Sequence, residues 1–179
     1  MKIYVIRHGE TDWNKEKLMQ GISDIPLNET GINQAKEARK KIGDIKFDAV
    51  YASTLDRAIT TASVIGGVDK SEVIQDERII EVSFGKYEKK KYYGIGLPMM
   101  LHWAFPETIP APKTVEKDSY TRKRAESFLA DLKKNDYNSV LICSHGNFIR
   151  VFRHILAGDN KKATYKDFVE NCELMEFEI

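Results

Sequence analysis

Arg7 and His8 stand side by side directly after the apolar run from Ile3 to Ile6. Such a run predicts a buried strand, and open α/β sheets bind ligands just beyond the carboxyl ends of their strands. Gly9 follows at once and allows the backbone to turn closely around a bound group. A guanidinium and an imidazole in that place can hold an anion, so the residue types and their order predict an anion site.

Two further apolar runs, residues 47–51 and 140–143, also read as buried strands that end in polar turns. Arg57 follows the first of these runs and His145 follows the second. The carboxyl ends of parallel strands meet at one edge of a sheet, so we expect both side chains to join the first pair. Two guanidinium groups and two imidazoles could neutralise the charge on the oxygens of a phosphate during its transfer.

A departing oxygen needs a proton, and Glu81 is the best candidate for the acid that supplies it. A carboxyl group beside a phosphate has its charged form disfavoured, so it can hold a proton near neutral pH. Glu77 and Glu88 lie nearby in the sequence. A carboxylate on a helix or loop surface is therefore the alternative interpretation of Glu81.

The apolar runs alternate with segments of helical spacing, which indicates an α/β fold in a single domain of residues 1–179. The least regular stretch, residues 87–117, holds four of the five prolines and resembles an inserted lid over the sheet edge. Its aromatic and methionine side chains could provide room for an organic leaving group or form a small lid core, and we favour the lid core. These side chains are Tyr92, Tyr93, Met99, Met100, Trp103 and Phe105. The remaining elements that we expect are helices near residues 30–42, 55–65, 119–134 and 146–156, and a last edge strand at 174–179.

Composition limits the partners of the chain. A formal net charge of +1 gives no general electrostatic argument for nucleic acid, and no segment approaches the ~20 apolar residues that a membrane span needs. The amino-terminal residues pass straight into strand pattern without the features of a signal peptide, so we expect a cytoplasmic protein. Cys143 and Cys172 have no partner at metal-ligand spacing and are expected to be reduced thiols.

Several separated motifs together resemble the histidine phosphatase superfamily, in its phosphoglycerate mutase-like branch. The resemblance covers most of the chain outside residues 87–116. The motifs are Arg7-His8-Gly9-Glu10-Thr11 with Asn14, Gln20-Gly21, Asp24 to Gly31 with Gln34-Ala35, Tyr51 to Ala58 with Thr61-Ala62, Glu81, and Ser144-His145-Gly146.

The resemblance implies a three-layer α/β/α sandwich with a mostly parallel sheet, and a metal-independent phosphomonoesterase that acts on a small phosphorylated metabolite. His8 would be the nucleophile that forms a phosphohistidine, with one ring nitrogen held by a backbone carbonyl, that of Gly9. Glu81 would act as acid and then as base. The phosphate would be held by Arg7, Arg57 and His145, with Asn14, Gln20, Gly21 and the amide of Gly146 as further substrate-binding positions. No metal is required.

Departures from the family pattern bear on the substrate. In family members a glycine usually follows the glutamate that stands at the position of Glu88. The run Gly85 to Lys89 lacks this glycine, so the lid has diverged. Chain length and the motif after Gln20 favour a phosphatase over a cofactor-dependent phosphoglycerate mutase, which would use bisphosphoglycerate. A non-catalytic phospho-ligand or protein-binding module is a second alternative, against which the retention of His8 argues. His102 and His154 are interpreted as non-catalytic, His154 as exposed, and the oligomeric state is left open.

Overall fold

A computed structural model describes residues 1–106, 108–159, 164 and 167–179 of the chain. Its sheet has the order β3-β2-β4-β1-β5, built from β1 (Lys2–Arg7), β2 (Ala49–Ala52), β3 (Ile74–Gln75), β4 (Ser139–Ser144) and β5 (Leu174–Glu178). The pairs β1–β4, β2–β4 and β2–β3 are parallel, and only the edge strand β5 runs antiparallel, against β1. The mostly parallel sheet expected from the sequence is confirmed.

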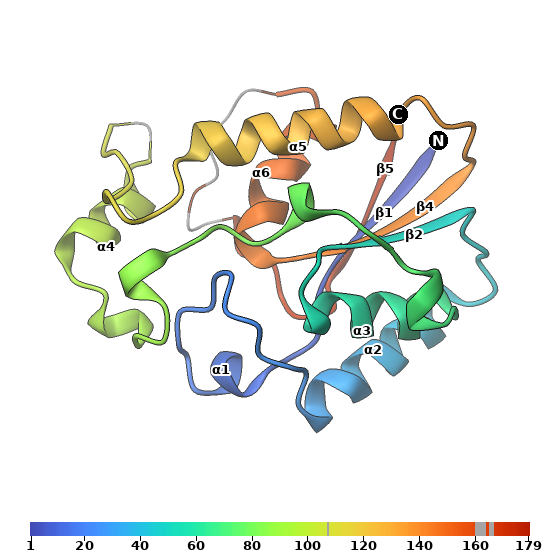
Figure 1. Ribbon diagram of the computed structural model, residues 1–179, viewed down its shortest axis with the longest axis horizontal. Helices are drawn as coiled ribbons and strands as arrows, with labels where there is room; N and C mark the ends of the chain where they lie inside the picture. Colours follow the sequence, from blue (N-terminus) through green and yellow to red (C-terminus); the bar gives the residue numbers. More distant parts are fainter. Residues whose placement is uncertain (107, 160–163, 165–166) are drawn as a thin grey trace.

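Helices cover both faces of this sheet, with α5 (Asp118–Leu132) and α6 (Gly146–Leu156) on one side and α2 (Glu29–Ile42) and α3 (Asp56–Gly66) on the other (Figure 1). Alternate residues of β1 divide between two cores. Ile3 and Val5 pack in the core under α5 and α6, whereas Tyr4 and Ile6 pack in the core under α2 and α3. The strands are buried on both faces, which is why they read as continuous apolar runs.

Local signals set the helix ends close to their expected places. The Asn28 side chain accepts a hydrogen bond from the amide of Gly31 and caps the start of α2. Gly43 and Gly67 follow α2 and α3 with φ of 70° and 67°, in the left-handed region that glycine adopts without a steric penalty. The expected last strand is also present as β5.

Two local expectations need correction. The two-residue strand β3 was not foreseen, because so short a segment carries no periodic signal. The second strand begins at Ala49 and not at Phe47. The Phe47 ring makes an edge contact with the ring of Tyr4, with 5.3 Å between the two centroids. No helix in the described ranges is both long enough and apolar enough to cross a membrane.

Residues 87–117 hold a short helix, α4 (Leu97–Ala104), set to one side of the sheet (Figure 1); Glu107 lies outside the described residues. Met99 is fully buried in a separate apolar cluster with Met19 and Phe84, against which Trp103 also packs. The lid-core interpretation holds for these side chains. It is wrong for four others, which are exposed: Tyr92, Tyr93, Met100 and Phe105.

Candidate active site

The three central strands end side by side, and this fixes the cluster. Arg7 of β1 is in register with Ser144 of β4, and Ala52 of β2 with Cys143 of β4. The strand pairing continues for one residue, since the amide of His8 donates to the carbonyl of Ser144 at 3.0 Å. The residues that follow each strand are therefore neighbours, and the rings of His8 and His145 lie 5.1 Å apart between centroids.

His8 is held as a neutral base. Its Nδ1 lies 2.7 Å from the carbonyl oxygen of Gly9, which can only accept, so Nδ1 carries the proton and Nε2 keeps its lone pair. This is the contact that the family resemblance implies. Burial, followed by the positive charges of Arg57 and Arg7, holds the pKa of His8 well below its ordinary value of 6.5. The ring is thus a neutral nucleophile at neutral pH.

His145 directly precedes α6 and is completely buried. Its Nε2 lies 2.6 Å from the hydroxyl of Ser53, and that hydroxyl already accepts from the amide of Leu55. Ser53 is therefore free to donate its proton to Nε2, which leaves Nδ1 as the protonated nitrogen. Nδ1 is buried and has no partner in the described part of the chain. Burial, then Arg57, His8 and Arg7, hold the pKa of His145 well below 6.5.

Arg57 is also completely buried, near the start of α3. Its two terminal nitrogens donate to the carbonyls of Ser23 at 2.6 Å and Gly21 at 2.7 Å, while Nε has no partner in the described ranges. Burial lowers the pKa of Arg57 to about 10, against the opposing charges of Glu81 and Asp24. Arg57 therefore fixes the loop at residues 21–23 and places a positive charge beneath the cluster.

Glu88 secures the same loop from the other side. Its carboxylate accepts from the amides of Ile22 at 3.1 Å and Ser23 at 3.0 Å, and also from the Ser23 hydroxyl. The lid thus contacts the loop held by Arg57, although the glycine that usually follows this glutamate is missing. Glu88 is a structural carboxylate and does not compete with Glu81 for the role of acid.

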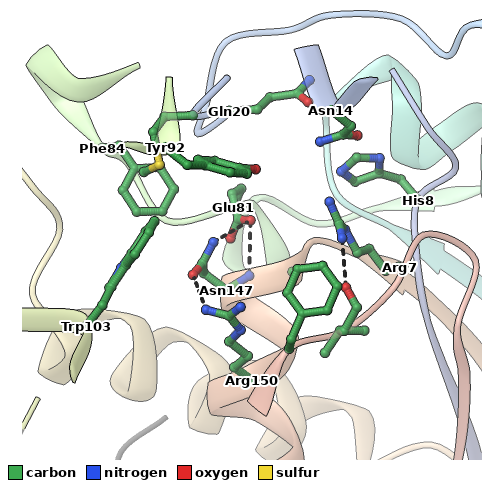
Figure 2. A pocket seen from close by; sticks show the side chains of 14 residues that line it. Arg7, His8, Asn14, Gln20, Glu81, Phe84, Tyr92, Trp103, Asn147 and Arg150 are labelled. Carbon is green, nitrogen blue, oxygen red and sulfur yellow. Dashed lines mark hydrogen bonds between the residues drawn. The ribbon is translucent and has the colours of Figure 1, made fainter. Parts of the chain in front are cut away.

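Asn14 and Gln20 present their amide NH2 groups to the site. The Asn14 side-chain oxygen accepts from the amide of Thr11 at 3.2 Å, and the Gln20 oxygen accepts from the hydroxyl of Thr11 at 2.7 Å. With both oxygens occupied, the NH2 groups remain for a ligand. The NH2 group of Gln20 is buried and meets no partner within the residues that the structure describes. Figure 2 shows both side chains beside His8.

The side chain of Glu81, a residue outside α6, contacts the first residues of that helix. One carboxylate oxygen accepts from the amides of Val82 at 2.8 Å and Phe148 at 3.0 Å, and the other from the amide of Asn147 at 3.1 Å. The Asn147 side chain donates to the second oxygen as well, at 3.3 Å. These four donors hold both oxygens of the Glu81 carboxylate in place.

A cavity of about 230 Å³ opens in front of this cluster (Figure 2). Six of the nine residues expected at the site line it: Arg7, His8, Asn14, Gln20, Glu81 and Gly146. Arg57, His145 and Gly21 do not appear in its described lining. The His145 ring nevertheless lies beside that of His8, which does line the cavity. The carbonyl of Gly21 accepts from Arg57.

Unpaired donors mark the chemistry of the cavity. Of the six buried side-chain polar atoms that have no partner in the described part of the chain, five belong to this cluster. All five are donor nitrogens, in Arg7, Gln20, Arg57, His145 and Arg150. Buried polar groups are normally hydrogen-bonded, so an excess of donors without acceptors indicates a site built for an anion.

Asn147, Arg150 and Phe168 are among the cavity-lining residues that sequence reasoning missed. Asn147 and Arg150 are three residues apart on α6, so they share the face that begins at Gly146. That spacing could have identified both. Nothing in the sequence pattern marks Phe168, whose ring lies 5.8 Å from the guanidinium of Arg7 and 5.7 Å from that of Arg150.

The two other histidines stand outside the described cavity lining. His102 is buried in α4, and its Nδ1 contacts the carbonyl of Ile109 at 2.8 Å. His154 was expected to be exposed, and this is wrong. Its side chain is only 13% exposed, because the carboxylates of Asp159 and Asp167 lie 3.0 Å and 3.7 Å from its ring nitrogens. Within the described residues, no group of three or more His, Cys, Asp and Glu side chains could hold a metal ion.

The fold and the site together define an α/β protein whose parallel strand ends hold a neutral histidine among donors for a phosphate-like anion. The chain belongs to the histidine phosphatase superfamily, branch 1, whose family model matches residues 3–179. The resemblance expected from the motifs is confirmed over nearly the whole chain.

The named relatives fall into two groups, phosphatases and phosphoglycerate mutases. The putative phosphoserine phosphatase 2 of Hydrogenobacter thermophilus is 29% identical over 182 residues, which cover 99% of this chain and 89% of the relative. The probable phosphoglycerate mutase GpmB of Erwinia tasmaniensis is 27% identical over 180 residues, covering 97% and 83%. The expected class, a phosphoric monoester hydrolase, is confirmed by the first group, and the second group fits the mutase alternative.

Solved structures support the same fold. A phosphoserine phosphatase from Entamoeba histolytica superposes with a TM-score of 0.85 in two complexes. A histidine-to-alanine mutant of that enzyme, in complex with phosphoserine, is 28% identical to this chain, and the complex with 3-phosphoglyceric acid is 29% identical. Each comparison covers 99% of this chain and 90% of the other. The expected three-layer fold is thereby confirmed.

Proposed function

We propose that this protein is a metal-independent phosphomonoesterase that hydrolyses small phosphorylated metabolites through a phosphohistidine on His8. The observation that carries the proposal is the state of His8, a neutral ring whose Nδ1 is held by Gly9 and whose other nitrogen is free to attack. The phosphatase names of the relatives support the same class.

In the first step, Nε2 of His8 attacks phosphorus, a nitrogen–phosphorus bond forms and the bond to the ester oxygen breaks. Arg7 and the unpaired Nδ1–H of His145 donate to the phosphoryl oxygens, with Asn14 and Gln20 as neutral donors. Arg57 contributes the positive charge of its buried guanidinium group. These groups supply the charge stabilisation that a metal ion supplies in other phosphoryl-transfer enzymes.

Glu81 completes both steps. Its carboxyl takes up a proton when the substrate dianion binds nearby, and gives it to the departing alcohol oxygen. In the second step the carboxylate removes a proton from a water molecule, whose oxygen attacks phosphorus and breaks the bond to His8. Inorganic phosphate leaves, and His8 is regenerated as the neutral ring.

Hydrolysis of p-nitrophenyl phosphate in the presence of EDTA tests this proposal, together with acid-free quenching and mass analysis of the His8 peptide. We expect turnover, a transient phosphoryl group on His8, and loss of both in His8→Ala. The matched control is His154→Asn, since that histidine lies outside the cavity lining. Equal rates for wild type and His8→Ala would refute the enzyme proposal and favour a binding module.

A phosphoglycerate mutase is the second candidate, favoured by relatives that carry that name. A mutase retains the phosphoryl group within the closed site and returns it to substrate, whereas a phosphatase admits water. Isomerisation of 3-phosphoglycerate that is stimulated by bisphosphoglycerate, without release of phosphate, would establish the mutase.

A further inference from the structure

The cavity contains a cation that the phosphoryl-transfer steps do not use. Arg150 lies on α6, one turn beyond Asn147, and lines the cavity on the far side of Glu81 from His8 (Figure 2). One terminal nitrogen donates to the side-chain oxygen of Asn147 at 3.1 Å, and Nε is buried with no partner among the described residues. The guanidinium is thus fixed in place with donors still available.

No carboxylate in the described part of the chain lies within ion-pair distance of Arg150. Glu81, the carboxylate in the same cavity, is occupied by N–H donors of Val82, Asn147 and Phe148. Asp167 pairs with Arg153 instead. An arginine that is largely removed from water without a charge partner is costly unless a ligand supplies one.

One wall of the cavity is aromatic (Figure 2). Phe84, Tyr92 and Trp103 line it, and the Trp103 ring lies 6.3 Å from Phe84 and 6.4 Å from Tyr92 between centroids. A volume of about 230 Å³ is below the ~300 Å³ at which pockets for drug-sized ligands begin. The space is sufficient for a phosphate and a short carbon chain.

We propose that Arg150 binds a carboxylate on the leaving group, so that the preferred substrates are small phosphomonoesters of hydroxy acids. This inference rests on the proposed function. Glu81 is protonated for the first step and then carries no charge. Three positive charges remain, on Arg7, Arg57 and Arg150, and the phosphate carries two negative ones. The remaining charge matches a monoanion such as a carboxylate, whose two oxygens fit the planar guanidinium.

Asn147 links this carboxylate end to the proton donor. Its side-chain oxygen accepts from Arg150, and its amide nitrogen donates to Glu81. The two contacts fix the amide in one orientation. Binding of a carboxylate by Arg150 therefore holds the leaving group at a set position relative to Glu81, and the chain between phosphate and carboxylate must be short.

The test compares matched ligands that differ at one group. 3-Phosphoglycerate and glycerol 3-phosphate share a three-carbon skeleton, and only the first has a carboxylate. We would measure kcat/KM for both with wild type, Arg150→Gln and, as a control on another helix, Arg122→Gln of α5. Calorimetric titration of the His8→Ala protein with the same ligands gives affinities that do not depend on turnover.

We expect wild type to prefer 3-phosphoglycerate, and Arg150→Gln to lose roughly 10- to 100-fold in kcat/KM for it, as expected for loss of hydrogen bonds to a charged group. The loss for glycerol 3-phosphate should be much smaller, and Arg122→Gln should match wild type for both. Arg150→Lys should restore part of the preference, because the charge returns without the planar fork.

Equal losses for both ligands in Arg150→Gln would overturn the inference, since a merely structural role predicts that result. Tighter binding of propane-1,3-diol bisphosphate than of 3-phosphoglycerate to His8→Ala would also overturn it, because Arg150 would then hold a second phosphate. If wild type hydrolyses nothing but the titrations still discriminate through Arg150, the proposed phosphatase activity fails and the carboxylate site stands. Titrations that do not discriminate between 3-phosphoglycerate and glycerol 3-phosphate refute the site.

Discussion

The neutral buried histidines predict how stability depends on pH. Burial and the neighbouring arginines hold the pKa of His8 and of His145 well below 6.5 in the folded protein, whereas the unfolded chain has ordinary values near 6.5. Below pH 6.5 the unfolded chain therefore binds more protons than the folded one. The free energy of unfolding is fully retained above pH 6.5 and decreases as the pH falls below it.

The magnitude follows from proton linkage. While the pH stays above the folded-state pKa, each such histidine lowers the free energy of unfolding by about 1.4 kcal/mol between pH 7.5 and pH 5.5. The two together lower it by ~2.7 kcal/mol. In His8→Asn only His145 remains, so the decrease over the same interval should be about half of that in wild type.

Urea denaturation at several pH values, in buffers free of phosphate, measures both decreases. Titrations of other groups are common to wild type and variant and cancel in the difference between their pH profiles. Parallel profiles for the two proteins would show that His8 is not held neutral by its surroundings. The nucleophile of the proposed mechanism would then need another source of activation.

Three further predictions concern single side chains. Glu81→Gln should lower kcat for glycerol 3-phosphate by roughly 10²- to 10⁴-fold, and less for p-nitrophenyl phosphate, whose leaving group needs little protonation; equal losses would argue against an acid role. Arg57→Lys should lower the free energy of unfolding by about 1.5–3 kcal/mol. The single side-chain nitrogen of lysine cannot occupy the positions of both terminal nitrogens that donate to the carbonyls of Gly21 and Ser23. Urea denaturation that detects no change would contradict that account. A Cβ in Gly9→Ala would collide with the carbonyl oxygen of Gly31, so we expect destabilisation of about 1–3 kcal/mol, while Gly94→Ala, whose nearest atom lies at 4.0 Å, serves as the thermal-melt control.

Strand ends and helix ends were predictable because their signals are local. The apolar run before Arg7 identifies β1, and Gly43 identifies the end of α2. The convergence of Arg7, His8 and His145 followed from the parallel topology alone, since adjacent parallel strands end at the same edge.

The parts that could not be predicted depend on contacts between distant segments. Arg57 reads as an ordinary helix residue, and only the fold shows that the loop at residues 21–23 encloses it. His154 is covered by Asp159 and Asp167, whose positions the helical pattern of α6 does not determine. Phe168 reaches the cavity from an irregular segment, and no periodicity marks it.

The wide separation of the site residues along the chain has a thermodynamic consequence. Arg7, Arg57, Glu81 and His145 come together only when β1, β2 and β4 are paired, so an unfolded or partly folded chain has no such cluster. Inorganic phosphate, the product of the proposed reaction, would then bind the native state alone. At a hundred times its dissociation constant it would stabilise the whole domain by about 2.7 kcal/mol. Accumulated product would slow turnover by occupying the cavity and, at the same time, protect the protein against unfolding.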